Sequence, residues 1–286
     1  MIASVLERAR VLFDRHPTTK RLIRSAVPNG LARRLQVAAT AQGIRTFDRR
    51  VVSHRFGDRN FDVVIADPVG EEWYDVDWPM PRELQLLADS RLVHGATVIE
   101  VGAHQGIVAM MLAGLVGPSG TVVAVEPNPH DYAVACENVR MNGVENVRLV
   151  NGAGAATDGT LSFSITGRVS DGSGGTGSVV VEAVTVDSLA ERYGRPDVVF
   201  IDTEGYEGEV LKGAKETLSE SPDFFVEVHA GRPLRRFGAT VDSVVKHFRR
   251  PPYKVVVGND DHPFVPLDKA DQRLLKHRFF LIALSV

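Results

Sequence analysis

The chain has 286 residues, 44% of them apolar and 24% charged, which is enough to bury a full hydrophobic core in one elaborated domain. The formal net charge of only −3 gives no indication of a strongly charged partner, and no nucleic-acid partner is expected. Because Cys136 is the only cysteine, an intramolecular disulfide and a zinc site built on several thiolates are excluded, and a reducing compartment is expected.

The N-terminal residues 1–45 are predicted to be helical, with breaks near Pro17 and Pro28. Residues 1–40 carry eight Lys or Arg against two acids, which gives a local net charge of +6. A solvated helical face explains this charge. Peripheral contact with an anionic membrane or an acidic partner is the alternative.

No transmembrane segment is expected. The longest apolar run, residues 107–116, is far shorter than the roughly 20 residues needed to cross a bilayer. Charges at Glu7, Arg8 and Arg10 interrupt the apolar stretch that a secretion signal needs, so the protein is expected to be cytoplasmic.

A β-hairpin is predicted next, because two apolar runs at 50–56 and 61–66 flank the turn residues Gly-Asp-Arg-Asn at 57–60. It is expected to cap one edge of the main domain. A helix from about Glu83 to Leu92 follows. The chain is therefore divided into two parts, a helical and hairpin extension at residues 1–80 and a main domain at residues 81–286.

From Ala96 onward strands and helices alternate, which predicts a parallel sheet covered by helices on both faces. A Gly-rich stretch between the third and fourth strands holds two further strands, Leu161–Ile165 and Val179–Val186, and its residues 170–178 are expected to form a mobile lid. The expected fold is α/β and Rossmann-like, with a seven-stranded, mostly parallel sheet. The seven candidate strands are 97–101, 121–125, 147–150, 198–201, 224–228, 253–257 and 279–284.

The first motif is Val-Ile-Glu-Val-Gly-Ala-His-Gln-Gly at residues 98–106, a buried strand that enters a glycine turn before a helix. Gly102 and Gly106 let the backbone approach a ligand, and parallel sheets bind ligands beyond the carboxyl ends of their strands. A nucleotide-like ligand is therefore expected here. His104 stands where a dinucleotide fingerprint needs a glycine, so the spacing favours S-adenosylmethionine over NAD. Glu100 is expected near the ammonium end of that ligand.

The second motif is Val-Glu-Pro-Asn-Pro at residues 125–129, in which Glu126 ends the second strand 20 positions after Gly106. A carboxylate here can accept hydrogen bonds from both ribose hydroxyls of a nucleoside ligand. This suits NAD and S-adenosylmethionine equally. Asn138 and Asn142 on the following helix are interpreted as structural capping residues.

The fourth strand leads into Ile-Asp-Thr-Glu-Gly-Tyr-Glu at residues 201–207, which places three carboxylates within six residues. Crowded carboxylates raise one another's pKa or recruit a cation, and both are common at active sites. Glu207 is expected to be the exception and to face solvent, because it falls on the next helix, predicted at 207–218. The fifth strand ends in Glu227-Val228-His229, where Glu227 and His229 share a face because strand side chains alternate.

Taken in order, these motifs resemble the FkbM family of methyltransferases over roughly residues 97–231. Glu100 stands where the family often has Asp, and Phe200 stands where it often has Lys, but neither departure affects the cofactor assignment. The resemblance implies a class I methyltransferase fold and an S-adenosylmethionine-dependent enzyme that methylates a hydroxyl of a sugar, glycolipid or polyketide-type natural product. It rests on six runs, at residues 100–106, 125–129, 185–189, 201–207, 210–214 and 227–229.

The catalytic residues are expected to be His229, Asp202, Glu227 and Glu204. In one mechanism His229 takes the acceptor proton and Asp202 or Glu227 fixes its tautomer. In the other, Asp202, Glu227 and His229 hold Mg²⁺ or Mn²⁺, as acids at the same strand ends do in catechol-type methyltransferases. The residues expected to bind the cofactor are Glu100, Gly102, Ala103, His104, Gly106, Glu126, Pro127, Asn128, Asn151, Gly152, Ala153 and Asp202.

Three alternatives stay open. N-methyl transfer to an amide or amine uses the same cofactor, and an NAD-dependent oxidoreductase is disfavoured by the missing glycine. A catalytically silent S-adenosylmethionine-binding domain that acts through its basic N-terminus is disfavoured by the carboxylates at 202, 204 and 227. The expected partner is a small-molecule or glycan acceptor, and assembly into a homo-oligomer is left open.

Overall fold

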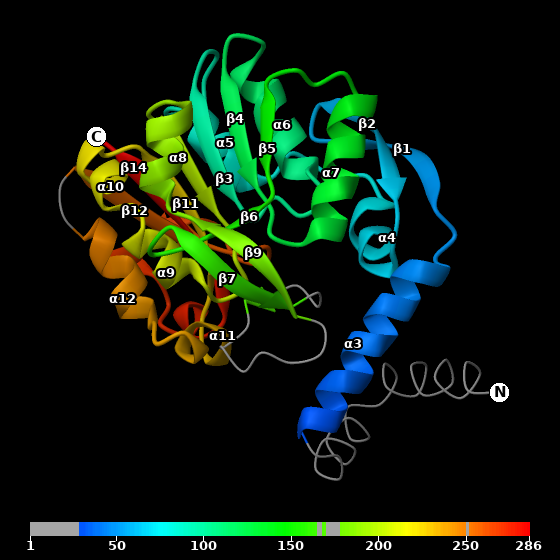
Figure 1. Cartoon of the computed structure of the whole chain (residues 1–286). Helices are drawn as coiled ribbons and strands as arrows, with labels where there is room; N and C mark the ends of the chain where they lie inside the picture. Colours follow the sequence, from blue (N-terminus) through cyan, green and yellow to red (C-terminus); the bar gives the residue numbers. More distant parts are fainter. Residues whose placement is uncertain (1–28, 165–167, 170–177, 250–251) are drawn as a thin grey trace.

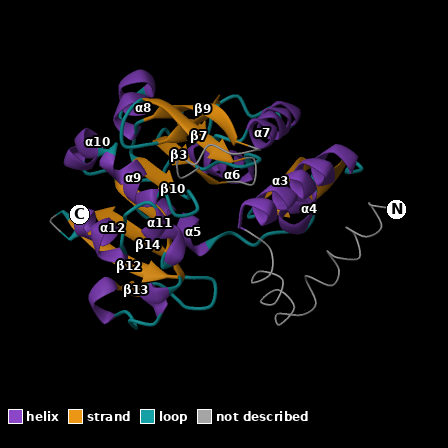
Figure 2. Ribbon diagram, turned by 60° about the horizontal axis from the view of Figure 1, so that its bottom comes forward, coloured by secondary structure: helices purple, strands orange, loops and turns teal. Residues whose placement is uncertain are grey.

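The computed structural model of the chain describes residues 29–164, 168–169, 178–249 and 252–286. The helical, basic segment expected before residue 29 and the expected lid, apart from Ser178, lie outside the described residues. Within the described residues an eight-stranded sheet forms the centre of the molecule, with helices on both faces (Figures 1 and 2). Each described helix is too short or too polar to cross a membrane.

The central sheet has the strand order β13-β12-β14-β11-β10-β3-β4-β5. Strands β5, β4, β3, β10 and β11 run parallel, whereas β14 is antiparallel to both β11 and β12. This is the predicted Rossmann-like, mostly parallel sheet, because all seven predicted strands are present and β13 is a short addition. The bounds are β3 Thr97–Val101, β4 Thr121–Val125, β5 Val147–Val150, β10 Val198–Ile201, β11 Asp223–His229, β12 Tyr253–Gly258, β13 Val265–Pro266 and β14 Arg278–Ser285.

Two hydrophobic cores lie on opposite faces of this sheet, because its strands are apolar on both sides. One face is covered by α5 (Arg82–Ala88) and α6 (Ile107–Val116), with α7 (Pro129–Met141) alongside. The core on the other face contains residues of five helices, which lie in the sequence between β9 and β12. These are α8 Val186–Tyr193, α9 Glu207–Lys212, α10 Lys215–Glu220, α11 Arg232–Arg236 and α12 Val241–Val245, followed by the 3₁₀ helices η1 Lys246–Phe248, η2 Leu267–Lys269 and η3 Leu274–Lys276.

The predicted helix 207–218 is two helices, α9 and α10, and the reason is a close backbone approach. A Cβ at Gly213 would lie 2.0 Å from the carbonyl oxygen of Ala155, so the chain can pass there only as glycine. The predicted strand Val179–Val186 ends earlier, because Thr185 caps α8. It is β9 (Ser178–Val184), which forms a second sheet with β6 (Gly152–Gly154), β7 (Gly159–Ser164) and β8 (Arg168–Val169).

The predicted hairpin is present as β1 (Arg50–Phe56) and β2 (Arg59–Ile65), with Gly57 and Asp58 as its turn. It forms its own two-stranded sheet and packs against α7 instead of extending the central sheet. Its companions α3 (Asn29–Thr46) and α4 (Pro68–Tyr74) lie on the side of the molecule away from the C-terminus (Figure 1).

Asn138 of α7 and Asn142, which follows the last residue of this helix, pair with the free edge of β2. Asn138 Oδ1 accepts a hydrogen bond from the Val64 N–H at 2.8 Å, and Asn142 Oδ1 accepts one from the Asp62 N–H at 2.9 Å. Asn138 is fully buried and also donates from Nδ2 to the Gln105 carbonyl at 2.9 Å. This single side chain therefore joins the hairpin, α7 and the turn after β3. The capping position predicted for both asparagines is found for Asn142, whereas Asn138 has a structural role within the helix.

We expect Asn138→Ala to lower the free energy of unfolding by about 2–3 kcal/mol, because it leaves a buried N–H and a buried carbonyl without partners. Asn142→Ala is the matched control, and its partly exposed bonds can be replaced by water, so the expected loss is about 1 kcal/mol or less. Urea unfolding of both variants measures the difference. Equal losses would contradict the proposed role of Asn138.

Candidate functional site

The turn after β3 is held against the ends of its two neighbouring strands. The Gly102 and Ala103 N–H groups both donate to the Val125 carbonyl of β4, at 2.9 and 3.0 Å. On the other side, a Cβ at Gly102 would lie only 1.7 Å from the carbonyl oxygen of Asp202 after β10. Gly102 and Gly106 have φ of +103° and +81°, which favour glycine, and His104 adopts φ +48° between them.

Glu126 fixes this turn from the end of β4. Its Oε2 accepts a hydrogen bond from the His104 N–H at 2.8 Å, and its Oε1 accepts one from the Asn128 N–H at 2.7 Å. Burial and the nearby charge of Asp131 raise the pKa of Glu126 to about 8, although the two backbone donors oppose the rise. Asn128 in turn caps α7. Asn151 donates from Nδ2 to the Glu126 carbonyl at 2.8 Å.

The remaining predicted cofactor residues lie around this carboxylate. Gly152 and Ala153 are buried in β6, and the Gly152 N–H also donates to the Glu126 carbonyl, at 3.2 Å. Pro127 is half-buried between Glu126 and Asn128. The loops after β3, β4 and β5 therefore meet at one place, as the sequence predicts for ligand binding beyond strand ends.

Glu100 is a buried carboxylate and Asp202 a partly exposed one, and each has a buried oxygen with unused hydrogen-bonding capacity. Glu100 is 1% exposed, and among the described residues neither its Oε2 nor the Oδ1 of Asp202 has a hydrogen-bond partner. Burial raises the pKa of Glu100 to about 8, and the charges of Asp202 and Glu126 add to this rise. Burial, followed by the charge of Glu227, also raises the pKa of Asp202. Such a group of acids is stabilised by a cationic ligand.

His229 is the centre of a second group of acids at the end of β11. Its Nε2 lies 3.4 Å from Glu227 Oε1, 3.6 Å from Glu204 Oε1 and 3.9 Å from Asp202 Oδ1. The four predicted catalytic side chains are thus brought together, and Asp202 belongs to both groups. Burial lowers the pKa of His229, but the hydrogen bond and charge of Glu207 and the other acids outweigh burial and raise that pKa to about 9.

The expectation that Glu207 faces solvent is wrong. It is fully buried, its Oε1 accepts a hydrogen bond from the Gly205 N–H at 2.8 Å, and the same oxygen lies 2.8 Å from His229 Nδ1. Glu207 is the first residue of α9, and the turn before it directs its side chain inward beneath His229. Glu207, rather than Asp202 or Glu227, therefore fixes the tautomer and orientation of His229.

Sequence reasoning missed two residues beside this group. Arg278 at the start of β14 lies in register opposite His229 and donates from Nε to Glu227 Oε1 and from Nη1 to Asp260. An antiparallel last strand would have indicated it, because such a strand begins where the parallel strands end. The second residue is Glu83 of α5, for which the sequence indicates only a helix start. Burial, with the charges of Asp260 and Glu227, raises the pKa of Glu83 to about 7.

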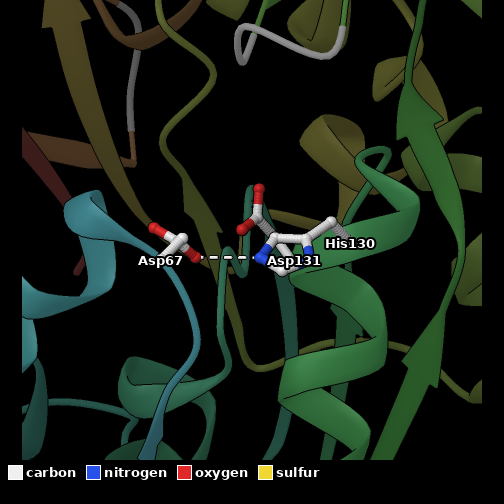
Figure 3. Close-up of side chains that lie close together, drawn as sticks. All are labelled: Asp67, His130 and Asp131. Carbon is white, nitrogen blue, oxygen red and sulfur yellow. Dashed lines mark hydrogen bonds and ion pairs between the residues drawn. The ribbon is translucent and has the colours of Figure 1, made fainter. Parts of the chain in front are cut away.

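A third polar cluster lies on the hairpin side of the cofactor turn (Figure 3). Asp67 Oδ1 caps α4 by accepting from the Val69 and Gly70 N–H groups, and its Oδ2 lies 2.9 Å from His130 Nε2. Gln105 of the turn donates from Nε2 to Asp67 at 2.6 Å and to Asp131 at 3.3 Å. These contacts hold α4 against the turn and the start of α7.

Among the described residues, two groups have ligand atoms close enough to hold one metal ion. They are Asp67, His130 and Asp131, and Asp202, Glu227 and His229, and in each group the ligand atoms lie within 4.8 Å of one another. In the first group the three side chains already form an ion pair and hydrogen bonds with Gln105, so they are satisfied without an ion. The second group is the one predicted from the sequence.

Comparison with known proteins gives two family matches. The family described as "Methyltransferase FkbM domain" matches residues 100–251, which is more than half of the chain. The family described as "Protein-L-isoaspartate(D-aspartate) O-methyltransferase" matches residues 31–161. The first match includes both groups of acids, whereas the second ends before Asp202.

Individual relatives give shorter matches. "Hexuronic acid methyltransferase AglP" of Haloferax volcanii is 30% identical over 137 residues, which are 46% of this chain and 55% of that protein. "Protein-L-isoaspartate O-methyltransferase" of Methanococcoides burtonii is 28% identical over 130 residues, which are 44% of this chain and 63% of that protein. The matches therefore span between about half and two thirds of these relatives. A solved S-adenosylmethionine-dependent O-methyltransferase from Thermotoga maritima aligns with a TM-score of 0.44 and 14% identity, over 83% of this chain and 77% of that chain.

The Asp67–His130 ion pair predicts a pH dependence of stability. Burial alone would raise the pKa of Asp67, but hydrogen bonds from His130, Gly70 and Val69 outweigh burial and lower that pKa to about 2. A carboxyl whose pKa is lower in the folded chain stabilises it above its unfolded pKa, near 4, and this stabilisation is lost as pH falls towards 2.

We therefore expect Asp67→Asn, which keeps a capping side chain, to cost about 2 kcal/mol of unfolding free energy at pH 5 and progressively less as the pH falls below 4. Urea unfolding between pH 2.5 and 6 measures this difference, with the exposed Asp62→Asn of β2 as the control. A cost that stays constant down to pH 2.5 would contradict the charge-based stabilisation.

Proposed function

The chain belongs to the FkbM family of methyltransferases, and from this premise we propose that it transfers a methyl group from S-adenosylmethionine to a hydroxyl of a sugar, glycolipid or polyketide-type natural product. The observation that carries the proposal is the pair of carboxylates Glu100, in β3, and Asp202, directly after the neighbouring strand β10, each of which has a buried oxygen without a hydrogen-bond partner among the described residues. The match to a hexuronic acid methyltransferase favours a sugar hydroxyl.

The residues present fit S-adenosylmethionine. When bound, this cofactor supplies a methyl group activated by a sulfonium charge. The raised pKa of Glu100 is opposed by no positive charge, and that of Asp202 is raised in spite of His229, so the sulfonium and ammonium groups of this ligand would stabilise both carboxylates. Glu126, oriented by two backbone donors, has lone pairs left to accept the ribose hydroxyls. Gly102 and Gly106 let the turn lie directly against the Asp202 carbonyl and against Ala135 of α7, which fixes the turn beside these acids.

His229 is proposed to accept the proton of the acceptor hydroxyl on Nε2, while Glu207 holds the proton on Nδ1. With a pKa of about 9 the imidazole is protonated at neutral pH in the free chain. A positive charge beside Asp202 opposes protonation of His229 and lowers its pKa towards the range in which it acts as a base. Asp202, Glu204 and Glu227 then stabilise the imidazolium that forms.

Metal binding by Asp202, Glu227 and His229 is the second candidate for this step, since their ligand atoms lie within 4.8 Å of one another. Mg²⁺ or Mn²⁺ suits two carboxylates and an imidazole. Against it, Arg278 already donates to the Glu227 oxygen nearest His229, so a cation occupies that side of the cluster. We therefore favour the base without a metal.

The match to protein isoaspartate methyltransferases is less informative about the acceptor. It covers residues 31–161, which include the cofactor turn and Glu126 but none of Asp202, Glu227 and His229. It therefore supports cofactor binding and leaves the acceptor to the second half of the domain. N-methyl transfer and a silent cofactor-binding domain are the outcomes that the activity measurements below would detect.

We expect Glu126→Gln to weaken binding of S-adenosylmethionine and of its demethylated product by about ten- to a hundredfold, because charged hydrogen bonds to the ribose are lost. Isothermal titration calorimetry measures both ligands, and NAD is expected not to bind. Glu137→Gln on the exposed face of α7 is the control. Wild-type affinity in Glu126→Gln, or tight binding of NAD alone, would refute the cofactor assignment.

The two candidates for the proton step differ under chelation. With a base and no metal, enzyme treated with EDTA keeps its rate of methyl transfer, and His229→Ala loses about a hundredfold or more in turnover. The control is His94→Ala, because His94 is exposed and lies before β3, outside the proposed catalytic group. Loss of activity on chelation with recovery on adding Mg²⁺ or Mn²⁺ would establish the metal instead. Unchanged turnover in His229→Ala would exclude the base.

A further inference from the structure

A cavity of about 390 Å³ lies between α11 and η3, and two of its lining residues are close in sequence to members of the proposed catalytic group. Gly231, which lines it, follows His229 by two residues at the end of β11, and Lys276, which also lines it, precedes Arg278 by two residues before β14. His229 and Arg278 are paired in register. Gly231 and Lys276 of the cavity therefore lie just beyond the paired strand ends that carry His229 and Arg278.

The lining of this cavity carries positive charge without negative charge. Arg235 and Lys276 line it together with apolar and hydroxyl side chains, and no carboxylate does. Both cations are exposed, and within the part of the chain that the structure describes neither of them forms an ion pair. Arg232 on the same short helix, α11, adds a further exposed cation.

Three acids near this cavity are paired with other cations, whereas Asp268, which lines the adjoining cavity, has no ion pair among the described residues. Asp260 is paired with Arg278 at 2.9 Å, Asp271 with Arg273 at 2.7 Å and Asp242 with Arg249 at 3.1 Å. Asp242 and Arg249 line an adjoining cavity of about 640 Å³ that shares Lys276 with the smaller one. Within the lining of the smaller cavity, Arg235 and Lys276 therefore have no carboxylate to offset their charge.

From this geometry we propose that the smaller cavity binds an anionic group of the methyl acceptor, a carboxylate or a phosphate, through Arg235 and Lys276. The inference rests on the proposed function and adds the chemical class of its substrate. The acids around His229 repel an anionic group, whereas Arg235 and Lys276 attract it. An acceptor with both a hydroxyl and an anionic group is therefore oriented with the hydroxyl towards His229.

The test uses the full chain and acceptors that differ only in the anionic group. Methyl glucuronide is compared with methyl glucoside for the carboxylate, and glucose 6-phosphate with glucose for the phosphate. Dissociation constants come from ligand-observed NMR, and methyl transfer is followed by product mass. The variant is Arg235→Gln with Lys276→Gln. The control is Arg140→Gln with Lys215→Gln, which removes two exposed cations on α7 and α10.

We expect the wild-type chain and the control to bind one anionic member about tenfold or more tightly than its neutral counterpart, and the variant to lose this preference. The arm that shows the preference identifies carboxylate or phosphate. Equal binding of both members in each arm, no detectable binding of either anionic member, or a preference that the variant retains would overturn the proposal.

Binding and methyl transfer separate this inference from the proposed function. A preference for the anionic member that depends on Arg235 and Lys276, with no methyl transfer to any hydroxyl, would leave the subsite and refute the proposed reaction. Methyl transfer to glucoside and glucose at the same rate as to their anionic counterparts would support the reaction and refute the subsite.

Discussion

The backbone of the turn after β3 runs so close to the end of β10 that no side chain fits between them. A Cβ at Gly102 would lie 1.7 Å from the Asp202 carbonyl oxygen. Because β3 and β10 are neighbours in the sheet, this approach brings Asp202 to the same buried region as Glu100. Burial and the charge of Asp202 raise the pKa of Glu100, burial and the charge of Glu227 raise that of Asp202, and added positive charge would stabilise both carboxylates. A cationic ligand is therefore expected beside Glu100 and Asp202.

Two kinds of buried acid are distinguished by their partners. Glu126, Glu207 and Asp67 each accept hydrogen bonds from backbone N–H groups, which orient them and tie neighbouring turns together. Glu100 and Asp202 each have an oxygen without a hydrogen-bond partner in the described part of the chain, as Glu207 does at Oε2, but no backbone N–H is found to donate to either of them there. The first kind builds the framework of the site. The acids of the second kind would gain their missing partner from a bound cation, because buried polar atoms are rarely left unpaired.

The fold was predictable because its signals are local and repeated. Apolar strands alternate with helices, and turn glycines mark the strand ends, so all seven main strands and the acids that follow them could be placed from the sequence. The break between α9 and α10 was not predictable, because it comes from the approach of Gly213 to Ala155, far away in the sequence. The position of β14 between β11 and β12 likewise depends on tertiary pairing.

The site was predictable at strand ends and not elsewhere. Asp202, Glu227 and His229 follow from strand order and side-chain alternation, whereas the inward direction of Glu207 depends on one turn before α9. Arg278 could be placed only with the last strand known to be antiparallel. Asp67 comes from the extension before the sheet, and its contacts with Gln105 and His130 depend on how the hairpin packs on α7. Long-range packing therefore decides which charged side chains complete the site.

The most direct test of the proposed cation site is the number of protons released when S-adenosylmethionine binds. Glu100 and Glu126, with pKa values of about 8, hold protons at pH 7 in the free chain; Glu100 must ionise to face the cationic end of the ligand, and Glu126 to accept both ribose hydroxyls. Calorimetry at pH 7 in buffers of different ionisation enthalpy is predicted to show release of about one to two protons per bound cofactor, and affinity that rises with pH. Binding without proton release, with the same affinity from pH 6 to pH 9, would contradict the account.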